Sequence, residues 1–337
     1  MIPTPRPTPP PRTLNPEGAP RRIGVELEFA AVSAGEGARL VAGLFGGRVV
    51  EEDPHRFRII DSRLGDFTAE LDSQYVHRAE GDAETAPDDP LEALLDGFQD
   101  RLRAFFGDLG SAVIPCEVVC PPVPLASLPD LEELVGALVK AGAEGTRAHP
   151  FHAFGAQLNL EIAEGGTPWI VDVLKAYLLL SDWLRAIIDV DLTRRLVAFA
   201  DPFPRDYVAR VVDPAYRPDL STLIDDYLAA NPTRDRELDM LPLFTWLDEG
   251  RVRARIDDPR VKARPALHYR LPDANLGQPG WSLTLEWSRW AVVERLAARR
   301  SVLEAMGQAW LEHRNRRLPG GLANDWALKA SEWLVLA

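Results

Sequence analysis

The chain has too few cysteines for a disulfide framework. Only Cys116 and Cys120 occur among its 337 residues, and both lie in CEVVC, which has the composition of a strand. Strand residues four apart are separated by roughly 13 Å, whereas a disulfide requires Cα atoms within about 7 Å of each other. We therefore expect two buried thiols that do not pair.

The chain also lacks an excess of positive charge. It has 38 basic and 51 acidic side chains, which give a net charge of −13. This balance argues against nucleic-acid binding, which needs a basic surface, and against docking on anionic membranes. ATP is still compatible with this charge, because Mg²⁺ can supply the positive partner.

No apolar run is long enough to cross a membrane. The most apolar stretch, 169–190, is interrupted by Asp172, Lys175, Asp182 and Arg185, and a membrane helix needs about 20 apolar residues. The N-terminal sequence MIPTPRPTPPPR contains no apolar segment of a signal peptide. We therefore expect a cytoplasmic protein without membrane contact.

Composition and pattern predict one folded domain of the α+β class. Hydrophobic residues make up 46% of the chain, which is enough for a core. Residues 1–20 are rich in proline and follow no helical or strand period, so we expect a disordered tail before a single domain over 21–337. Strands are predicted mostly in the first half, and a helical segment at about 169–260 follows, which favours α+β over a doubly wound sheet.

The periodicity of the apolar residues predicts the individual elements. Alternation predicts strands over 22–30, 47–51, 56–61, 66–76, 112–120, 154–162 and 266–271. Spacings of three and four residues predict helices near 36–45, 90–105, 129–142, 169–188, 219–230, 234–249, 281–299, 301–315 and 323–335.

Five of these strands carry polar residues on one face, because side chains two apart lie on the same side of a strand. In strand order they are Glu26 and Glu28; Glu70 and Asp72; Glu117; Gln157, Asn159 and Glu161; and His268 and Arg270. One interpretation is a set of solvated faces on half-buried antiparallel strands. The other is a metal site, because oxygen and imidazole donors suit hard cations and gathered carboxylates repel one another unless cations lie between them.

Several catalytic motifs are absent. The sequence contains no G-x-x-x-x-G-K-[ST], which excludes a P-loop nucleotide site. It also contains neither G-x-S-x-G nor H-E-x-x-H. Any nucleotide chemistry must therefore use a different kind of site.

Three segments, GVELEF at 24–29, EVVCPP at 117–122 and GAQLNLE at 155–161, resemble the carboxylate–amine ligases. These form the glutamate–cysteine ligase and glutamine synthetase superfamily, and the closest resemblance is to its amidoligase branch. The pattern of that branch has E-x-E on the first strand, then a strand of the form E-φ-φ-x-P, then G-x-H-x-N and E-F-R strands. The matching segments keep this order, and they identify 21–337 as one amidoligase-like catalytic domain.

The resemblance implies both a fold and a reaction. The fold is a curved antiparallel half-barrel with helices packed outside, which binds ATP and Mg²⁺ or Mn²⁺ in its funnel. The reaction phosphorylates a substrate carboxylate to an acyl phosphate, which an amine then attacks to form an amide. Phosphoryl transfer of this kind requires mainly positioning and charge neutralisation. The implied partners are small-molecule or peptide carboxylates and amines.

The resemblance also assigns roles to residues on the polar strand faces. Arg270 matches the arginine that contacts the ATP phosphates, and Glu117 matches a metal-binding carboxylate; we take both as catalytic candidates. Asn159 is a further candidate for ATP binding. Gln157 replaces the usual histidine, and His268 replaces the usual glutamate of E-F-R. The resulting set of expected metal ligands is Glu26, Glu28, Glu70, Asp72, Glu117, Gln157 and His268.

Three further residues have two interpretations each. Lys175, in an apolar helical run, either contacts a phosphate or extends its ammonium to the surface. Arg234 either clamps a substrate carboxylate or belongs to a loop that precedes a capped helix. Glu161 adds one carboxylate to the metal face, and we expect it to contact the substrate.

The two replaced ligands leave two alternatives to ligase activity. The protein could be a catalytically degenerate relative that binds a nucleotide or a peptide. It could also be a guanidino phosphotransferase on the same fold, in which case phosphate stays on nitrogen and no amide forms.

Overall fold

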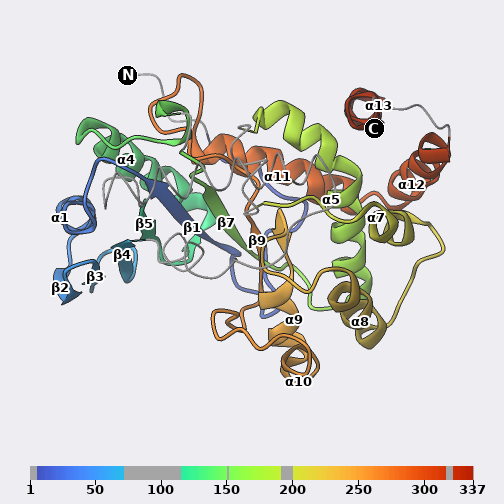
Figure 1. Ribbon diagram of the computed structural model, residues 1–337, viewed down its shortest axis with the longest axis horizontal. Helices are drawn as coiled ribbons and strands as arrows, with labels where there is room; N and C mark the ends of the chain where they lie inside the picture. Colours follow the sequence, from blue (N-terminus) through green and yellow to red (C-terminus); the bar gives the residue numbers. More distant parts are fainter. Residues whose placement is uncertain (1–5, 72–114, 150–151, 191–199, 316–321, 337) are drawn as a thin grey trace, which may run out of the picture.

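The computed structural model describes residues 6–71, 115–149, 152–190, 200–315 and 322–336 (Figure 1). Its strands are β1 (Arg22–Phe29), β2 (Arg48–Asp53), β3 (Arg56–Ile60), β4 (Phe67–Leu71), β5 (Cys116–Val119), β6 (Val123–Pro124), β7 (Ala156–Glu161), β8 (Leu238–Asp239) and β9 (Ala266–Tyr269). They form one nine-stranded sheet in the order β2-β3-β4-β5-β1-β7-β9-β8, with β6 beside β1. All the strand pairs are antiparallel.

Ten α-helices lie in the described part of the chain. They are α1 (Ala34–Phe45), α4 (Leu128–Lys140), α5 (Thr167–Ile188), α7 (Arg205–Val212), α8 (Leu220–Ala230), α9 (Leu241–Leu247), α10 (Glu249–Arg253), α11 (Leu283–Ala297), α12 (Arg300–Asn315) and α13 (Leu322–Leu336). Within the described ranges, no helix has both the length and the apolar character needed to cross a membrane.

Local sequence explains where several helices begin. At α1, the Ser33 hydroxyl accepts a hydrogen bond from the Glu36 amide while the Glu36 carboxylate accepts one from the Ser33 amide, which is a capping box. The hydroxyl of Ser282 caps α11 in the same way by accepting from the Leu285 amide at 3.0 Å. Each cap satisfies amides that have no partner inside the helix.

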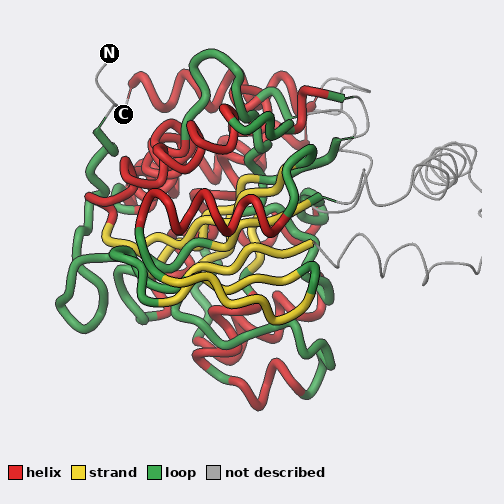
Figure 2. Tube along the Cα trace, turned by 90° about the vertical axis from the view of Figure 1, so that its left-hand side faces the viewer, coloured by secondary structure: helices red, strands yellow, loops and turns green. Residues whose placement is uncertain are grey.

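Helices cover one face of the sheet. The apolar side chains of β1 are fully buried, and a Cβ atom on Gly37 of α1 would lie 3.6 Å from Phe29 and 3.6 Å from Val118. The ring of Tyr269 on β9 packs against Tyr177 of α5 and Trp290 of α11, with centroids 5.9 and 5.2 Å apart. Figure 2 shows the strands with helices above and a smaller helical group below, where Figure 1 places α9 and α10.

The predicted antiparallel sheet with packed helices is observed, but the described strands form an open sheet. The half-barrel curvature therefore stays a prediction. The single helix predicted over 234–249 is wrong: the chain there forms β8, then α9 and the first residue of α10. A helix through 234–249 would place Pro242 in its interior, where proline removes a hydrogen bond and clashes with the preceding turn; instead Pro242 lies in the first turn of α9.

Most of the Pro-rich segment is packed against the domain. The indole nitrogen of Trp287 donates to the Thr8 carbonyl at 2.7 Å, and the Arg21 guanidinium donates to the Arg12 carbonyl at 3.0 Å. Arg12 also forms an ion pair with Glu164. Residues 6–20 therefore differ from the disordered tail that we expected. Backbone hydrogen bonds within 13–21 fold the end of this segment into a turn, whereas the Thr8 and Arg12 carbonyls accept from side chains of the domain.

Three predicted elements fall partly or wholly outside the described residues. The strand expected over 66–76 is described as far as Leu71, and the strand expected over 112–120 is described from residue 115 onward. The helix expected from Pro90 lies outside the described ranges, as does the predicted metal ligand Asp72.

Candidate functional site

The strand register brings the predicted polar residues of five strands to one face of the sheet. Glu28 is the direct partner of Glu117 across β1 and β5, and Glu117 is the partner of Glu70 across β5 and β4. Directly opposed residues of antiparallel strands lie on the same face. By the same pairing Glu26 is opposite Gln157, and Asn159 is opposite His268. We call this face, with Glu26, Glu28, Glu70, Glu117, Gln157, Asn159 and His268, the polar face.

Two other predicted site residues, Glu161 and Lys175, form their contacts away from the polar face. The Glu161 carboxylate, at the end of β7, accepts from the Arg22 amide at 2.6 Å and from the Asn15 side chain at 3.1 Å, so the N-terminal segment holds it. Lys175 is buried on α5, and its ammonium donates to the Asp213 carbonyl at 2.7 Å. Because α5 packs on the apolar face of the sheet, Lys175 does not join the polar face.

The acidic row of the polar face consists of Glu28, Glu117 and Glu70. The Glu28 carboxylate accepts from the Gly155 amide at 2.8 Å, and Glu70 forms an ion pair with Arg56 at 3.1 Å. Burial raises the pKa of Glu70, and nearby carboxylates, including that of Glu26, raise it further against the effect of Arg56.

The carboxylates of the acidic row have the chemistry of a hard-cation site, but their side chains do not converge on one position. Three carboxylates stand opposite one another on adjacent strands, and such oxygens suit Mg²⁺ or Mn²⁺. As the side chains lie, no group of three acidic, histidine or cysteine residues in the described part of the chain converges on a metal position. The partner of Glu70, Arg56, has a half-exposed side chain, so this ion pair is replaceable.

A chain of hydrogen bonds crosses the polar face from β1 to β9. The Asn159 amide nitrogen donates to Glu26 Oε1 at 2.7 Å, and the Gln157 amide nitrogen donates to Asn159 Oδ1 at 2.8 Å. The same Gln157 nitrogen lies 3.2 Å from His268 Nδ1. The Gln157 atom that faces His268 is therefore an amide nitrogen, which cannot bind a cation, so this arrangement does not support joint metal binding by Gln157 and His268.

Positive charge gathers at the β8–β9 end of the polar face. Arg270 donates from Nη2 to Asp239 Oδ2 at 3.3 Å, and the fully buried Asp239 is the register partner of His268. Burial alone would lower the pKa of Arg270, but the Asp239 carboxylate reverses this, and the pKa is raised. Arg234 lies nearby: burial and the charge of Arg270 lower its pKa.

Nε of Arg234 and Nε2 of His268, both in this region, are buried without a hydrogen-bond partner among the described residues. Burial places the pKa of His268 well below its ordinary value, and the positive charges of Arg270, Arg264 and Arg234 act in the same direction. The imidazole is therefore neutral, and its Nε2 has no hydrogen-bond partner in the part of the chain that the structure describes.

Sequence reasoning missed Asp239. The helix expected over 234–249 hid the short strand β8, whose pairing with β9 brings Asp239 beside His268. Pro242 was the signal that could have separated this strand from the helix that follows.

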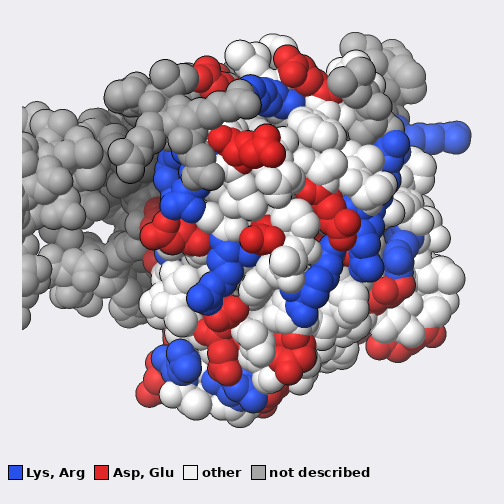
Figure 3. All heavy atoms as spheres, turned by 90° about the vertical axis from the view of Figure 1, so that its right-hand side faces the viewer, with Lys and Arg blue, Asp and Glu red and all other residues white. Residues whose placement is uncertain are grey.

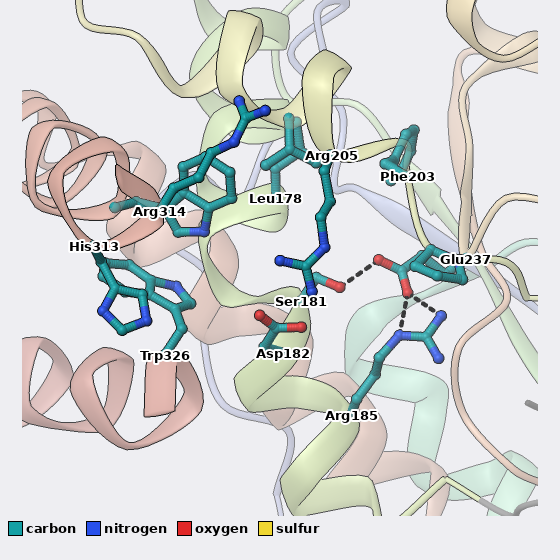
Figure 4. Close-up of a pocket in the computed structure, with 13 residues that line it drawn as sticks. Leu178, Ser181, Asp182, Arg185, Phe203, Arg205, Glu237, His313, Arg314 and Trp326 are labelled. Atoms are coloured by element: carbon teal, nitrogen blue, oxygen red, sulfur yellow. Dashed lines mark hydrogen bonds and ion pairs between the residues drawn. The ribbon is translucent and has the colours of Figure 1, made fainter. Parts of the chain in front are cut away.

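A separate cavity of about 330 Å³ lies against α5, on the side of α12 and α13 (Figure 4). Glu237 accepts from the Ser181 hydroxyl at 2.5 Å and from Arg185 Nε at 2.7 Å in its wall. Burial, together with the negative charge of Glu237, raises the pKa of Asp182 to about 6. None of the polar-face residues lines this cavity.

The surface over α7, α8 and α12 has mixed charge. Figure 3 shows basic and acidic side chains interspersed there. Several form ion pairs, including Arg210–Asp226, Arg217–Glu304 and Arg314–Asp206. The described residues of this face therefore form no extended surface of one sign.

Comparison with known proteins agrees with the motifs on the polar face. Searches among curated proteins and among solved structures find no match. A family described as "Putative amidoligase enzyme" matches residues 19–292, which include every described residue of the polar face. The chain therefore belongs to this amidoligase family.

Proposed function

We propose that the protein is an ATP- and divalent-metal-dependent ligase that joins a carboxylate to an amine through an acyl phosphate. Membership of the amidoligase family supports a ligase at the level of the reaction class. The nucleotide, the metal and the mechanism are our proposal. The substrates would be small-molecule or peptide carboxylates and amines.

The observation that carries the proposal is the division of the polar face into an acidic row and a basic end. Glu28, Glu117 and Glu70 stand in register, while Arg270 and Arg234 lie toward β8 and β9. Carboxylates that would hold divalent ions and guanidinium groups that would hold oxyanions are the two charge types that phosphoryl transfer needs. When bound, the ions would neutralise phosphate charge and polarise the transferred group.

The side chains of this chain would act by binding and orientation. Arg270, held in place by Asp239, would contact a phosphate of ATP, and Arg234 would contact a second oxyanion. The substrate carboxylate would take the γ-phosphoryl group and release ADP; the amine would then attack the acyl carbon, and phosphate would leave. No protein nucleophile is required in this sequence of bonds.

The direct test is to incubate the protein with ATP, Mg²⁺ or Mn²⁺, and a panel of carboxylates and amines. ADP release that depends on both substrates, with an amide detected by mass spectrometry, is the expected result. Glu117→Gln should lose this activity, whereas Glu312→Gln on the exposed surface of α12 should retain it. Phosphate found on a guanidino nitrogen, with no amide, would instead indicate a phosphotransferase.

One observation favours a degenerate relative as the second candidate. Glu70 is ion-paired with Arg56, and the Gln157 nitrogen faces His268, so the carboxylates and the replaced ligands are engaged within the protein. A degenerate relative would bind the nucleotide in calorimetry without releasing ADP for any substrate pair. A protein that neither binds ATP nor releases ADP would contradict both candidates.

A further inference from the structure

The hydrogen bonds from Glu26 to His268 have a direction that one residue determines. A carboxylate has only acceptor atoms, so Glu26 must receive the hydrogen from Asn159, and the Asn159 oxygen must then point away from Glu26. That oxygen accepts from the Gln157 nitrogen at 2.8 Å. Glu26 therefore sets the orientation of both amide groups.

The second hydrogen of the Gln157 amide determines the tautomer of His268. It points to Nδ1 of the imidazole, 3.2 Å from the Gln157 nitrogen, and Nδ1 must accept it. A neutral imidazole carries its hydrogen on one nitrogen only. The hydrogen of His268 is therefore on Nε2.

The Nε2–H group of His268 is buried and has no hydrogen-bond partner in the described part of the protein. His268 itself is 6% exposed. A buried donor without an acceptor destabilises the folded protein, so such a donor indicates a missing acceptor. The guanidinium groups around it indicate that this acceptor is negatively charged.

The charged groups that act on the His268 imidazole are guanidinium groups, and carboxylates lie beside two of them. Arg234, Arg264 and Arg270 all act on the imidazole, and Asp239 is the carboxylate that pairs with Arg270. The Nε atom of Arg234 is also buried without a hydrogen-bond partner. An oxyanion within hydrogen-bond distance of either atom would satisfy a donor that has no partner among the described residues.

We propose that Glu26, Asn159 and Gln157 hold His268 as its Nε2–H tautomer, and that this group and Arg234 bind an oxyanion of the substrates, either a phosphate or a carboxylate. This inference deepens the proposed function, because it assigns the His268 position to substrate binding. Glu26, Asn159 and Gln157 are positioning residues, since they act through His268. We call Glu26, Asn159, Gln157 and His268 the relay.

The tautomer can be measured without nucleotide or metal. In protein labelled with ¹⁵N-histidine, long-range ¹H–¹⁵N correlations distinguish a protonated ring nitrogen from an unprotonated one, and loss of signals in His268→Gln assigns His268 among the six histidines. The expected pattern is Nε2–H. In Gln157→Glu the new carboxylate can only accept, so the hydrogen should move to Nδ1. Gln278→Glu, in an exposed loop, should leave the pattern unchanged.

A variant at the far end tests the relay itself. Glu26→Gln replaces an acceptor-only group with an amide that can also donate, so the direction of the chain is no longer set and both tautomers should appear. Glu26 makes its relay hydrogen bond to Asn159, so a change at His268 would have to pass through the two amides. An unaltered Nε2–H pattern in both Glu26→Gln and Gln157→Glu would overturn the relay.

Inorganic phosphate and acetate, titrated separately, distinguish the two kinds of oxyanion. The expected result is a saturable shift of the His268 Nε2–H signal with one of them. Gln157→Met, which removes the donor without adding charge, should weaken that binding on the order of 10- to 100-fold, the effect of losing a hydrogen bond to a charged group. Nδ1–H in the wild-type protein, or no shift with either anion, would overturn the proposal.

These outcomes are separate from those of the ligase assay. Amide formation by a protein whose His268 carries Nδ1–H would overturn the relay and leave the proposed function standing. If His268 carries Nε2–H and binds phosphate but the protein releases no ADP, the relay would stand and the proposed function would be contradicted.

Discussion

Glu28 and Glu117 are direct register partners across β1 and β5, and Glu117 is in turn opposite Glu70. Two like charges opposed on one sheet face destabilise the fold unless something lies between them. Glu117 is central to this row, because it is the member with an acidic partner on each side. A cation bound to this row would therefore relieve more charge repulsion at Glu117 than at Glu28 or Glu70.

Glu117→Gln should weaken Mn²⁺ binding by at least about 10-fold, because even residues that only support metal ligands contribute factors of 10–100. Titration of Mn²⁺ followed by electron paramagnetic resonance measures this affinity directly. Glu312→Gln, which removes a carboxylate from the exposed side of α12, is the matched control. Equal Mn²⁺ affinity in the wild type and Glu117→Gln would remove the acidic row from the proposed metal site.

Arg270→Ala should lower turnover by about 10²–10³, the effect of losing one preorganised charge contact in a transition state. It should also lower the free energy of unfolding by about 3–5 kcal/mol, because Asp239 would be left buried without its partner. Arg270→Lys should not restore full activity if the contact is bidentate. Steady-state kinetics and urea unfolding give the two quantities.

A double variant separates these two effects of Arg270. Arg270→Ala with Asp239→Asn removes both charges, so much of the lost stability should return while turnover stays low. Recovery of turnover together with stability would show that Arg270 acts only through the fold.

Lys175→Met should leave nucleotide affinity unchanged, because the ammonium binds the Asp213 carbonyl in the helical layer and not the polar face. Burial lowers the pKa of Lys175 to about 8, so the charge is costly where it lies, and its role there is structural. Calorimetric titration with an ATP analogue checks the affinity. A clear loss of binding in Lys175→Met, with folding intact, would return Lys175 to the nucleotide site.

Asp182→Asn should make the protein more stable at pH 7. The pKa of Asp182 is raised from 3.8 to about 6 by burial and then by Glu237, so the folded protein disfavours the charged form. The contribution of the Asp182 carboxyl group to the free energy of unfolding is therefore fully present below about pH 4. It is lost as the pH rises through about 6. The gain of Asp182→Asn at pH 7 should be about 1–2 kcal/mol after allowance for partial exposure.

Urea unfolding at pH 4, 5, 6 and 7 measures that difference. The curves of wild type and Asp182→Asn should lie closest at pH 4, separate progressively between pH 4 and 6, and stay a nearly constant distance apart above pH 6. Asp257→Asn, at an exposed loop position, should follow the wild type at every pH. A constant offset between Asp182→Asn and the wild type at all four values would contradict the assigned pKa.

The polar face was predictable from the sequence because alternation in a strand follows directly from burial on one side. Val25 and Leu27 could be assigned to the core, and Glu26 and Glu28 to the other face, without knowledge of any neighbouring strand. The register was not predictable. Whether Glu28 meets Glu117 depends on how two strands separated by nearly ninety residues pair, and local sequence carries no information on that pairing.

The positions of Lys175 and Asp239 were not predictable for a different reason. Lys175 lies in a helix that is apolar on most sides, so periodicity could not show which side faces the polar residues of the sheet. Asp239 lies in a two-residue strand, and so short a segment has no period. Its position depends on hydrogen bonding to β9, which is a tertiary contact.

An open sheet exposes strand edges, and at the β2 end the sequence protects that edge. Arg48, Glu51, Glu52 and Asp53 are exposed on β2, and the register with β3 shifts between Glu51 and Asp53. Charges and a bulge at an edge disfavour the addition of a strand from another molecule. At the other end β8 has only two residues, too few to template one. The sheet can therefore stay unclosed at high protein concentration without becoming a nucleus for aggregation.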